Sequence, residues 1–146
     1  MSNVNEQLTM TGHLQIRLND ELVRDVPNLV VTAGKGFVAT RMIGTGAGVM
    51  SHMEVGTGTT DPVAGNTTLE SAVSSSRTAF TSSAAVSGAV VTYITAFAAG
   101  TGTGALTEAG IFNASSGGTM LCRTEFSVVN KGAADTMTIT WTVTVS

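Results

Sequence analysis

The strictest pattern in this chain is the alternation of apolar and polar residues over its last strand-like segment, 136–145. Met137, Ile139, Trp141, Val143 and Val145 occupy one side of the segment, and the residues between them are all threonines. Successive side chains of a β-strand point to opposite faces of the sheet. The segment therefore predicts a strand with one dry face and one hydroxyl-rich face, and it places Trp141 in the core.

The same period of two marks the start of the chain. Apolar residues fill most even positions from 8 to 18, and polar residues fill the odd positions between them. Asn19 and Asp20 then supply turn chemistry, and 21–26 is predicted to return as a second strand, which makes a β-hairpin. We expect Pro27 to end that strand or to place it at an edge, because proline has no N–H for the ladder.

After this hairpin the period changes and then returns to two. Apolar spacings of three and four residues over 34–43 predict one short helix, with Thr32 as the candidate N-cap. A long loop is predicted over 56–66 and one helical turn over 68–73. Further strands are predicted over 50–55, 77–86, 89–97, 106–113, 120–128 and 136–145. The pattern indicates an all-β fold, an antiparallel β-sandwich or jelly-roll-like barrel with one short helix.

The length of 146 residues allows one domain and is too small for two independent cores. We assign residues 8–146 to a single β domain and residues 1–7 to an N-terminal arm. The arm contains too little apolar surface to offset the entropy of ordering it, so we expect a partner to order it. The predicted partner-contacting residues are Ser2, Asn3, Val4, Asn5, Glu6 and Gln7.

Charge limits the classes of partner. Only 12% of the residues are charged, with 7 basic and 10 acidic side chains, so the chain cannot neutralise a row of phosphates and we expect no nucleic acid partner. Its apolar stretches are too short to span a membrane. The first residues lack the features of a signal peptide, so synthesis in the cytoplasm is expected. So few charges also indicate that partners cover much of the surface, since charge normally maintains solubility.

One segment is a candidate cofactor site. Residues 34–39 match the pattern G-x-G-x-x-A, follow a short apolar run and precede a helix, and Glu54 stands twenty residues after Gly34. In a dinucleotide-binding fold such glycines admit a pyrophosphate and the acidic residue binds a ribose hydroxyl. That fold needs further strand-helix-strand units, which the period-two pattern beyond residue 75 does not provide. We interpret the segment as a glycine-rich turn that starts a packing helix, and we expect no cofactor.

Other reactive side chains are also predicted to be structural. His52 and Glu54 would share one strand face, but a metal needs a third ligand, and only Asp61 lies near in sequence, so we expect this to be a solvated outer face of the strand. No serine stands in G-x-S-x-G, and the carboxylates are scattered. Glu108 and Glu125 lie in or beside apolar strands, where we expect structural ion pairs with Arg77 or Arg123. Cys122, the single cysteine, is expected to be buried. We therefore predict no catalytic residue, no metal site and no enzyme.

Three groups of residues resemble a family of small virion proteins of tailed bacteriophages. They are NLVVTAGK at 28–35, MEVGTGTTDP at 53–62 with NTTLE at 66–70, and LTEAGIFN at 106–113 with GTMLCRTEF at 118–126, Lys131 and the final threonine-rich strand. Their order and spacing agree with the family over residues 28–145. The resemblance implies a non-enzymatic structural component of the particle, and the family pattern includes no catalytic residues.

On this basis we expect a capsid decoration, or cement, protein on the outside of the phage head. It would bind the major capsid protein and itself, as a dimer or trimer, and so bridge neighbouring subunits in the virion. The alternative is a tail or fibre-associated module in which loops 44–48 and 100–104 contact a host receptor or glycan. The aromatic content of 5% argues against sugar stacking. The number of copies per virion would separate these two functions.

Overall fold

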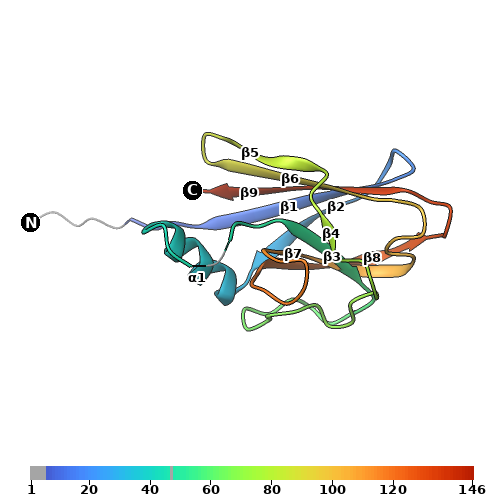
Figure 1. The fold of residues 1–146 in the computed structure, drawn as a ribbon, viewed down its shortest axis with the longest axis horizontal. Helices are drawn as coiled ribbons and strands as arrows, with labels where there is room; N and C mark the ends of the chain where they lie inside the picture. The colour runs from blue at the N-terminus through green and yellow to red at the C-terminus, as the bar shows by residue number, and fades with distance from the viewer. Residues whose placement is uncertain (1–5, 47) are drawn as a thin grey trace, which may run out of the picture.

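The computed structural model describes residues 6–46 and 48–146, and it confirms the all-β prediction. The elements in chain order are β1 (Met10–Leu18), β2 (Glu21–Val30), α1 (Thr32–Arg41), β3 (His52–Gly56), β4 (Thr78–Ala79), β5 (Ser82–Ser87), β6 (Val90–Phe97), β7 (Gly104–Phe112), β8 (Met120–Lys131) and β9 (Met137–Val145). Each pair of neighbouring strands is antiparallel. Figure 1 shows these strands running along the molecule, with α1 at the end where β1 begins.

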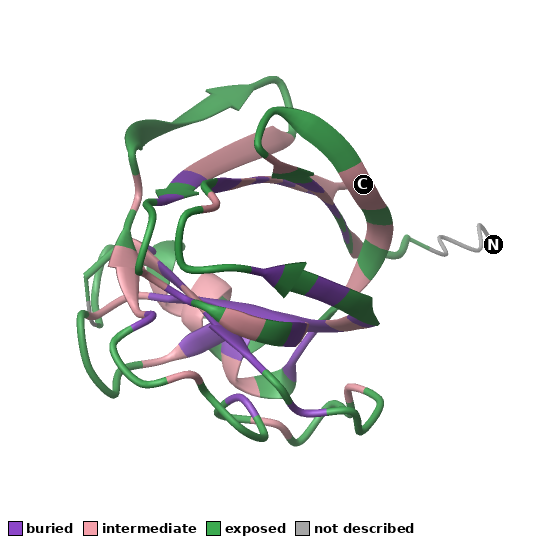
Figure 2. Ribbon diagram, turned by 90° about the vertical axis from the view of Figure 1, so that its right-hand side faces the viewer, coloured by how far each residue is buried: buried purple, intermediate pink, exposed green. Residues whose placement is uncertain are grey.

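The strands form one curled sheet in the order β4-β3-β7-β8-β2-β1-β9-β6-β5 (Figures 1 and 2). β2 forms one bend of the sheet, because its first part pairs with β1 as far as Asn28 and its last two residues pair with β8. At the other side the Phe80 N–H donates to the Ser51 carbonyl beside β3, and the Thr81 N–H donates to Ile94 of β6. The segment 78–87 therefore leads from β3 across to β6, and the sheet encloses its core.

The core lies inside this curl, between β1, β6 and β9 on one side and β3, β7 and β8 on the other. Its buried members include Leu14, Phe97, Ile111, Phe126 and Trp141. Trp141 is fully buried, which confirms the prediction from the alternating strand. Its indole N–H donates to Oδ1 of Asn28 at 2.7 Å, so the polar atom of this large side chain is paired inside the protein.

The first hairpin also forms as predicted. Asn19 and Asp20 have φ values of 49° and 69°, and they join Leu18 to Glu21, as in a type I′ turn. The expectation for Pro27 is wrong, because β2 continues through it to Val30. The proline stands where β2 leaves β1 and joins β8, so its missing N–H coincides with the change of partner.

Two other local predictions are also wrong. The strand predicted over 77–86 is split into β4 and β5, because the chain changes partner from β3 to β6 at Phe80 and Thr81. No helical turn forms over 68–73. The N–H groups of Glu70 and Ser71 donate to the Glu108 carboxylate instead of to earlier carbonyls of the same segment.

The long loop over 56–71 covers the side of β7 and β8 that faces away from the main core. A second apolar cluster forms beneath it from Val31, Leu69, Phe112 and Met120. This cluster explains why the segment stays ordered without secondary structure, because Leu69 anchors it by apolar burial.

Candidate functional site

Helix α1 follows directly on β2 and packs against β8. Thr32 is its first residue and does not cap it; the N-cap is Val31, with extended backbone and no side-chain hydrogen bond. The Val31 carbonyl accepts the helical bond from Lys35 at 3.0 Å, and the Thr32 N–H donates to Ala64 of the long loop at 2.8 Å. The loop therefore supplies an acceptor for one of the N–H groups at the start of the helix that have no partner within the helix.

The glycines of the G-x-G-x-x-A segment have different surroundings. A Cβ on Gly34 would overlap the backbone carbonyl of Leu121 in β8, whereas a Cβ on Gly36 would meet nothing within 4 Å. Gly34 is thus needed for close approach of the helix to the strand. Glu54, in the position of the ribose-binding acid, forms an ion pair with Arg77 at 3.3 Å.

Large apolar side chains lie in solvent around α1. Met42 and Ile43 follow the helix, Leu8 precedes β1 and Val49 precedes β3, and their exposed fractions are 84%, 76%, 74% and 65%. We call these four residues the helix end. Single exposed apolar residues are common on soluble proteins, but a group of four around one short helix is typical of a surface that binds another protein.

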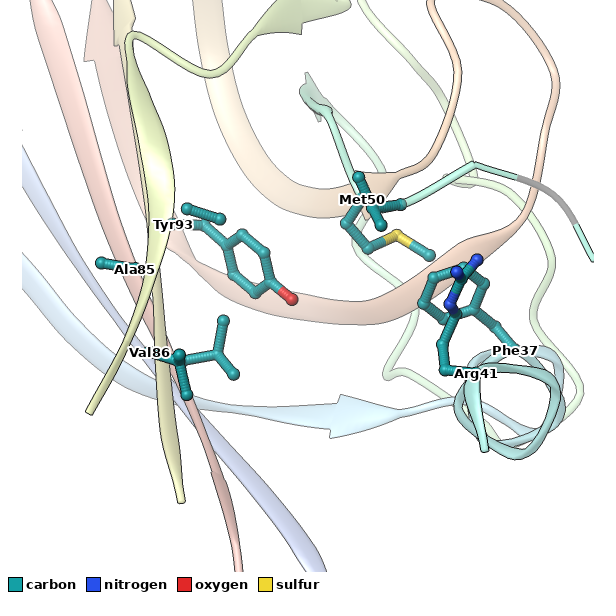
Figure 3. Close-up of a pocket in the computed structure, with 9 residues that line it drawn as sticks. Phe37, Arg41, Met50, Ala85, Val86 and Tyr93 are labelled. Carbon is teal, nitrogen blue, oxygen red and sulfur yellow. The ribbon is translucent and has the colours of Figure 1, made fainter. Parts of the chain in front are cut away.

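A groove of about 360 Å³ runs between α1 and the β5–β6 hairpin (Figure 3). The helix contributes Phe37 and Arg41, whose guanidinium lies 5.9 Å from the Phe37 ring centre. On the opposite wall the hydroxyl of Tyr93 points into the groove, with Val86 beside it. Burial, with a smaller effect of Cys122, raises the pKa of Tyr93 to about 12. Its hydroxyl therefore stays protonated and can donate to a ligand.

A second groove of about 480 Å³ lies on the other side of α1, where the chain enters β1. Leu8 and Met42 of the helix end line it, together with Lys35. Across the described lining of both grooves the charged side chains are Lys35 and Arg41, and both are basic. The surface is therefore apolar with a positive contribution, which favours a partner that is apolar and acidic.

The structure describes only two of the six residues predicted to contact a partner. Ser2, Asn3, Val4 and Asn5 lie outside the described residues. Glu6 and Gln7 are exposed, and Gln7 lines the second groove beside Leu8. The end of the predicted arm therefore adjoins the helix end.

Glu108 lies fully buried beneath the long loop and binds it through backbone donors. Its Oε2 accepts from the N–H groups of Gly58 at 2.7 Å and Ser71 at 2.8 Å, and its Oε1 accepts from the N–H of Glu70 at 2.9 Å. Oε1 also accepts from Nε of Arg123 at 3.1 Å. Three loop donors and one guanidinium thus converge on a single carboxylate.

Arg123 connects the same carboxylate to the far part of the loop. One terminal nitrogen donates to Oδ1 of Asn66 at 3.1 Å and the other donates to the Thr60 carbonyl at 3.0 Å. Of the two partners predicted for Glu108, Arg77 and Arg123, the structure shows Arg123. Glu125 makes no ion pair with any residue that the structure describes, although it faces Glu108 across the strands. The Glu108–Arg123 pair fixes the loop, and its hydrogen-bonding groups are occupied by this structural role.

Arg77 pairs with Glu54 and not with Glu108 or Glu125. Its guanidinium carbon lies 3.6 Å from the ring centre of Phe112, and one terminal nitrogen donates to the Ala114 carbonyl at 2.9 Å. Burial, and secondly this nearby positive charge, lower the pKa of His52. The strand face of His52 and Glu54 is therefore occupied by structural contacts, not only by solvent as the sequence suggested.

The other candidates are dispersed. No three His, Cys, Asp or Glu side chains within residues 6–46 and 48–146 come together in a way that could hold a metal ion. Asp61 lines a polar hollow with Arg123 and Glu70. Cys122 is buried, as predicted, and burial raises the pKa of its thiol well above the ordinary value. None of the described helices is long and apolar enough to cross a membrane.

Sequence reasoning missed the helix end and most of the loop anchors. One available signal was the pair Met42 and Ile43, which directly precedes the glycine-rich stretch 44–48 and so has no strand or helix in which to be buried. The partners of Arg123 at Thr60 and Asn66 had no such signal, because they lie about sixty residues earlier in the chain.

Comparisons of the chain with protein-family models, curated proteins and solved structures found no match.

Proposed function

We propose that this protein is a non-enzymatic structural component of a bacteriophage virion, a decoration protein that binds the outside of the head through its helix end. The observation that carries the proposal is the group of four exposed apolar residues around α1, in a chain with only 12% charged residues. Such a surface gains free energy when another protein covers it.

The charge of the two grooves supports a protein partner with carboxylates. Lys35 lines the second groove beside Leu8 and Met42, so an acidic patch on the major capsid protein would complement it. Each contact of this kind contributes little binding free energy. A dimer or trimer of the protein would engage several capsid subunits at once, and linked contacts add through the high effective concentration of the second binding site.

The buried polar network supports a structural role. Glu108 and Arg123 hold a loop that has no secondary structure of its own, and they do so with hydrogen bonds of 2.7–3.1 Å. A module that bridges capsid subunits has to transmit force without deforming, and a loop fixed at several points is stiffer than a free one. The placement on the head rests on the sequence resemblance given above.

Reconstitution on heads that lack this protein tests the proposal. Purified wild-type protein should co-sediment with such heads and raise the temperature at which they rupture. Met42→Asp should lose most of this binding, because it places a carboxylate in an apolar contact beside the proposed acidic patch. Leu22→Asp is the matched control, since Leu22 is also exposed and lies at the β1–β2 turn, away from α1.

Quantifying the protein in intact virions completes the test. Hundreds of copies per particle support decoration of the head. A small copy number, equal to the number of subunits in one ring of the tail or fibre, would favour the tail or fibre alternative. Absence from the virion, or equal binding of Met42→Asp and wild type to heads, would contradict the proposal.

A further inference from the structure

The outer strand of the sheet, β5, has an open edge. β5 pairs only with β6 among the described strands, and all six of its residues are exposed. We call the side of Ser82–Ser87 that faces away from β6 the β5 edge. A free edge presents unpaired N–H and C=O groups, which form a template for another strand.

The β5 edge lacks the charged side chains and prolines that commonly prevent such pairing. Residues 78–107 include no charged side chain and no proline. One register shift lies between Ser82 and Ala85, and the remainder of the strand up to Ser87 is regular. At the other end of the sheet β4 has only two residues, so it offers little edge. Natural proteins usually protect an edge with charge, proline or short length.

The hairpin turn determines which groups face outward. Gly88 has a φ of 59°, and Ser87 pairs with Val90 across a two-residue loop, as in a type II′ turn. Ser87 therefore exchanges its hydrogen bonds with β6, and by alternation the N–H and C=O of Val86 point away from the sheet. The Val86 side chain is 71% exposed.

We propose that the β5 edge pairs antiparallel with the β5 edge of a second copy of this chain. Two identical antiparallel strands complement each other under a two-fold axis, so each Val86 would supply the donor and acceptor that its counterpart lacks. The uncharged stretch allows this approach without like-charge repulsion, and it offers no charge by which an unrelated partner would be selected. The contact is made by backbone groups of β5, so the inference does not require a capsid partner, although β5 side chains also line the first groove together with Val49 of the helix end.

Sedimentation over a concentration series tests this contact with one edge variant and one control. Wild type should dimerise, and Ala85→Lys should weaken the dimer by about tenfold or more, because it places one positive charge on each strand directly beside the two-fold axis at Val86. Ala96→Lys makes the same change at an exposed site on β6, which is not an edge, and should match wild type. A wild-type monomer at every concentration, or equal dimerisation of Ala85→Lys, would overturn the proposal.

Cysteine cross-linking gives a second measurement that does not depend on the lysine variant. Ala84, Ala85 and Val86 are replaced by cysteine one at a time. Because the native Cys122 is buried, the introduced cysteine is then the accessible thiol of each variant. At least one should form a reducible disulfide dimer on mild oxidation, while Ala96→Cys should not. If none of the three variants cross-links, the β5 edge is not the contact. The same holds if the dimer dissociates on deletion of residues 2–7 and not in the β5 variant.

Discussion

Replacement of Glu108 by alanine tests whether one carboxylate holds the long loop. The change removes the acceptor for three backbone N–H groups and leaves the Arg123 guanidinium buried without its counter-ion. Removal of one partner of a buried ion pair typically costs about 3 to 5 kcal/mol. For a domain of this size each kcal/mol lowers the melting temperature by about 2 to 4 °C, so we expect a decrease of about 6 to 20 °C.

The assay is thermal unfolding followed by circular dichroism, with Glu125→Ala as the control. Glu125 faces Glu108 across β7 and β8 but has no ion pair with the described residues, so its loss should change the melting temperature by only a few degrees. In native-state hydrogen exchange, the amides of Gly58, Glu70 and Ser71 should lose protection in Glu108→Ala only. Equal melting temperatures for the two variants would refute the role assigned to Glu108.

Four further predictions concern the helix, the core, the arm and pH. Gly34→Ala should destabilise the domain because the new methyl group overlaps a β8 carbonyl, whereas Gly36→Ala in the same helix should stabilise it by up to about 1 kcal/mol. If urea unfolding shows Gly34→Ala to be more stable than Gly36→Ala, this packing of helix and strand is excluded. Trp141→Ala should lower the free energy of unfolding by about 3 to 5 kcal/mol and leave much of the protein insoluble; a soluble variant with a near wild-type melting temperature would contradict the burial of this side chain. Deletion of residues 2–7 should barely change the melting temperature yet weaken retention on particles; early unfolding would assign the segment to the domain. The pKa of His52 measured by NMR should lie below the ordinary histidine value. The unfolded chain then binds a proton at higher pH than the folded one, so the free energy of unfolding should decrease as pH falls through the ordinary value, and His52→Gln should remove this pH dependence.

The helix end and the β5 edge divide the surface between two kinds of contact. The helix end combines exposed apolar residues with Lys35 and Arg41 nearby, whereas the β5 edge offers backbone groups and no charge. The first suits a partner with its own acidic surface, and the second suits an identical strand. Met42→Asp should therefore weaken binding to heads and leave self-association unchanged, because Met42 lines the second groove, to which β5 contributes no residue.

Local sequence was sufficient for the elements whose pattern is set by neighbours along the chain. The alternation over 137–145 identified β9 and the buried face that holds Trp141, because one dry and one wet face impose a period of two on any such strand. Asn19 and Asp20 identified the first hairpin, because these residues tolerate the positive φ that its turn requires. The burial of Cys122 and an ion pair of Glu108 with an arginine were also predicted, but the choice of Arg123 over Arg77 came only from the structure.

Only the tertiary structure decided features that depend on partners far away in the chain. β2 continues through Pro27 because β8 replaces β1 as its neighbour there, and 77–86 divides because the sheet curls and exchanges β3 for β6. The turn over 68–73 is not helical because a carboxylate almost forty residues later takes its N–H groups. Whether Met42 is buried or exposed likewise depends on which segments cover α1. Periodicity along a chain records which face of a segment is dry, but the identity of the covering segment is fixed only when distant strands pair.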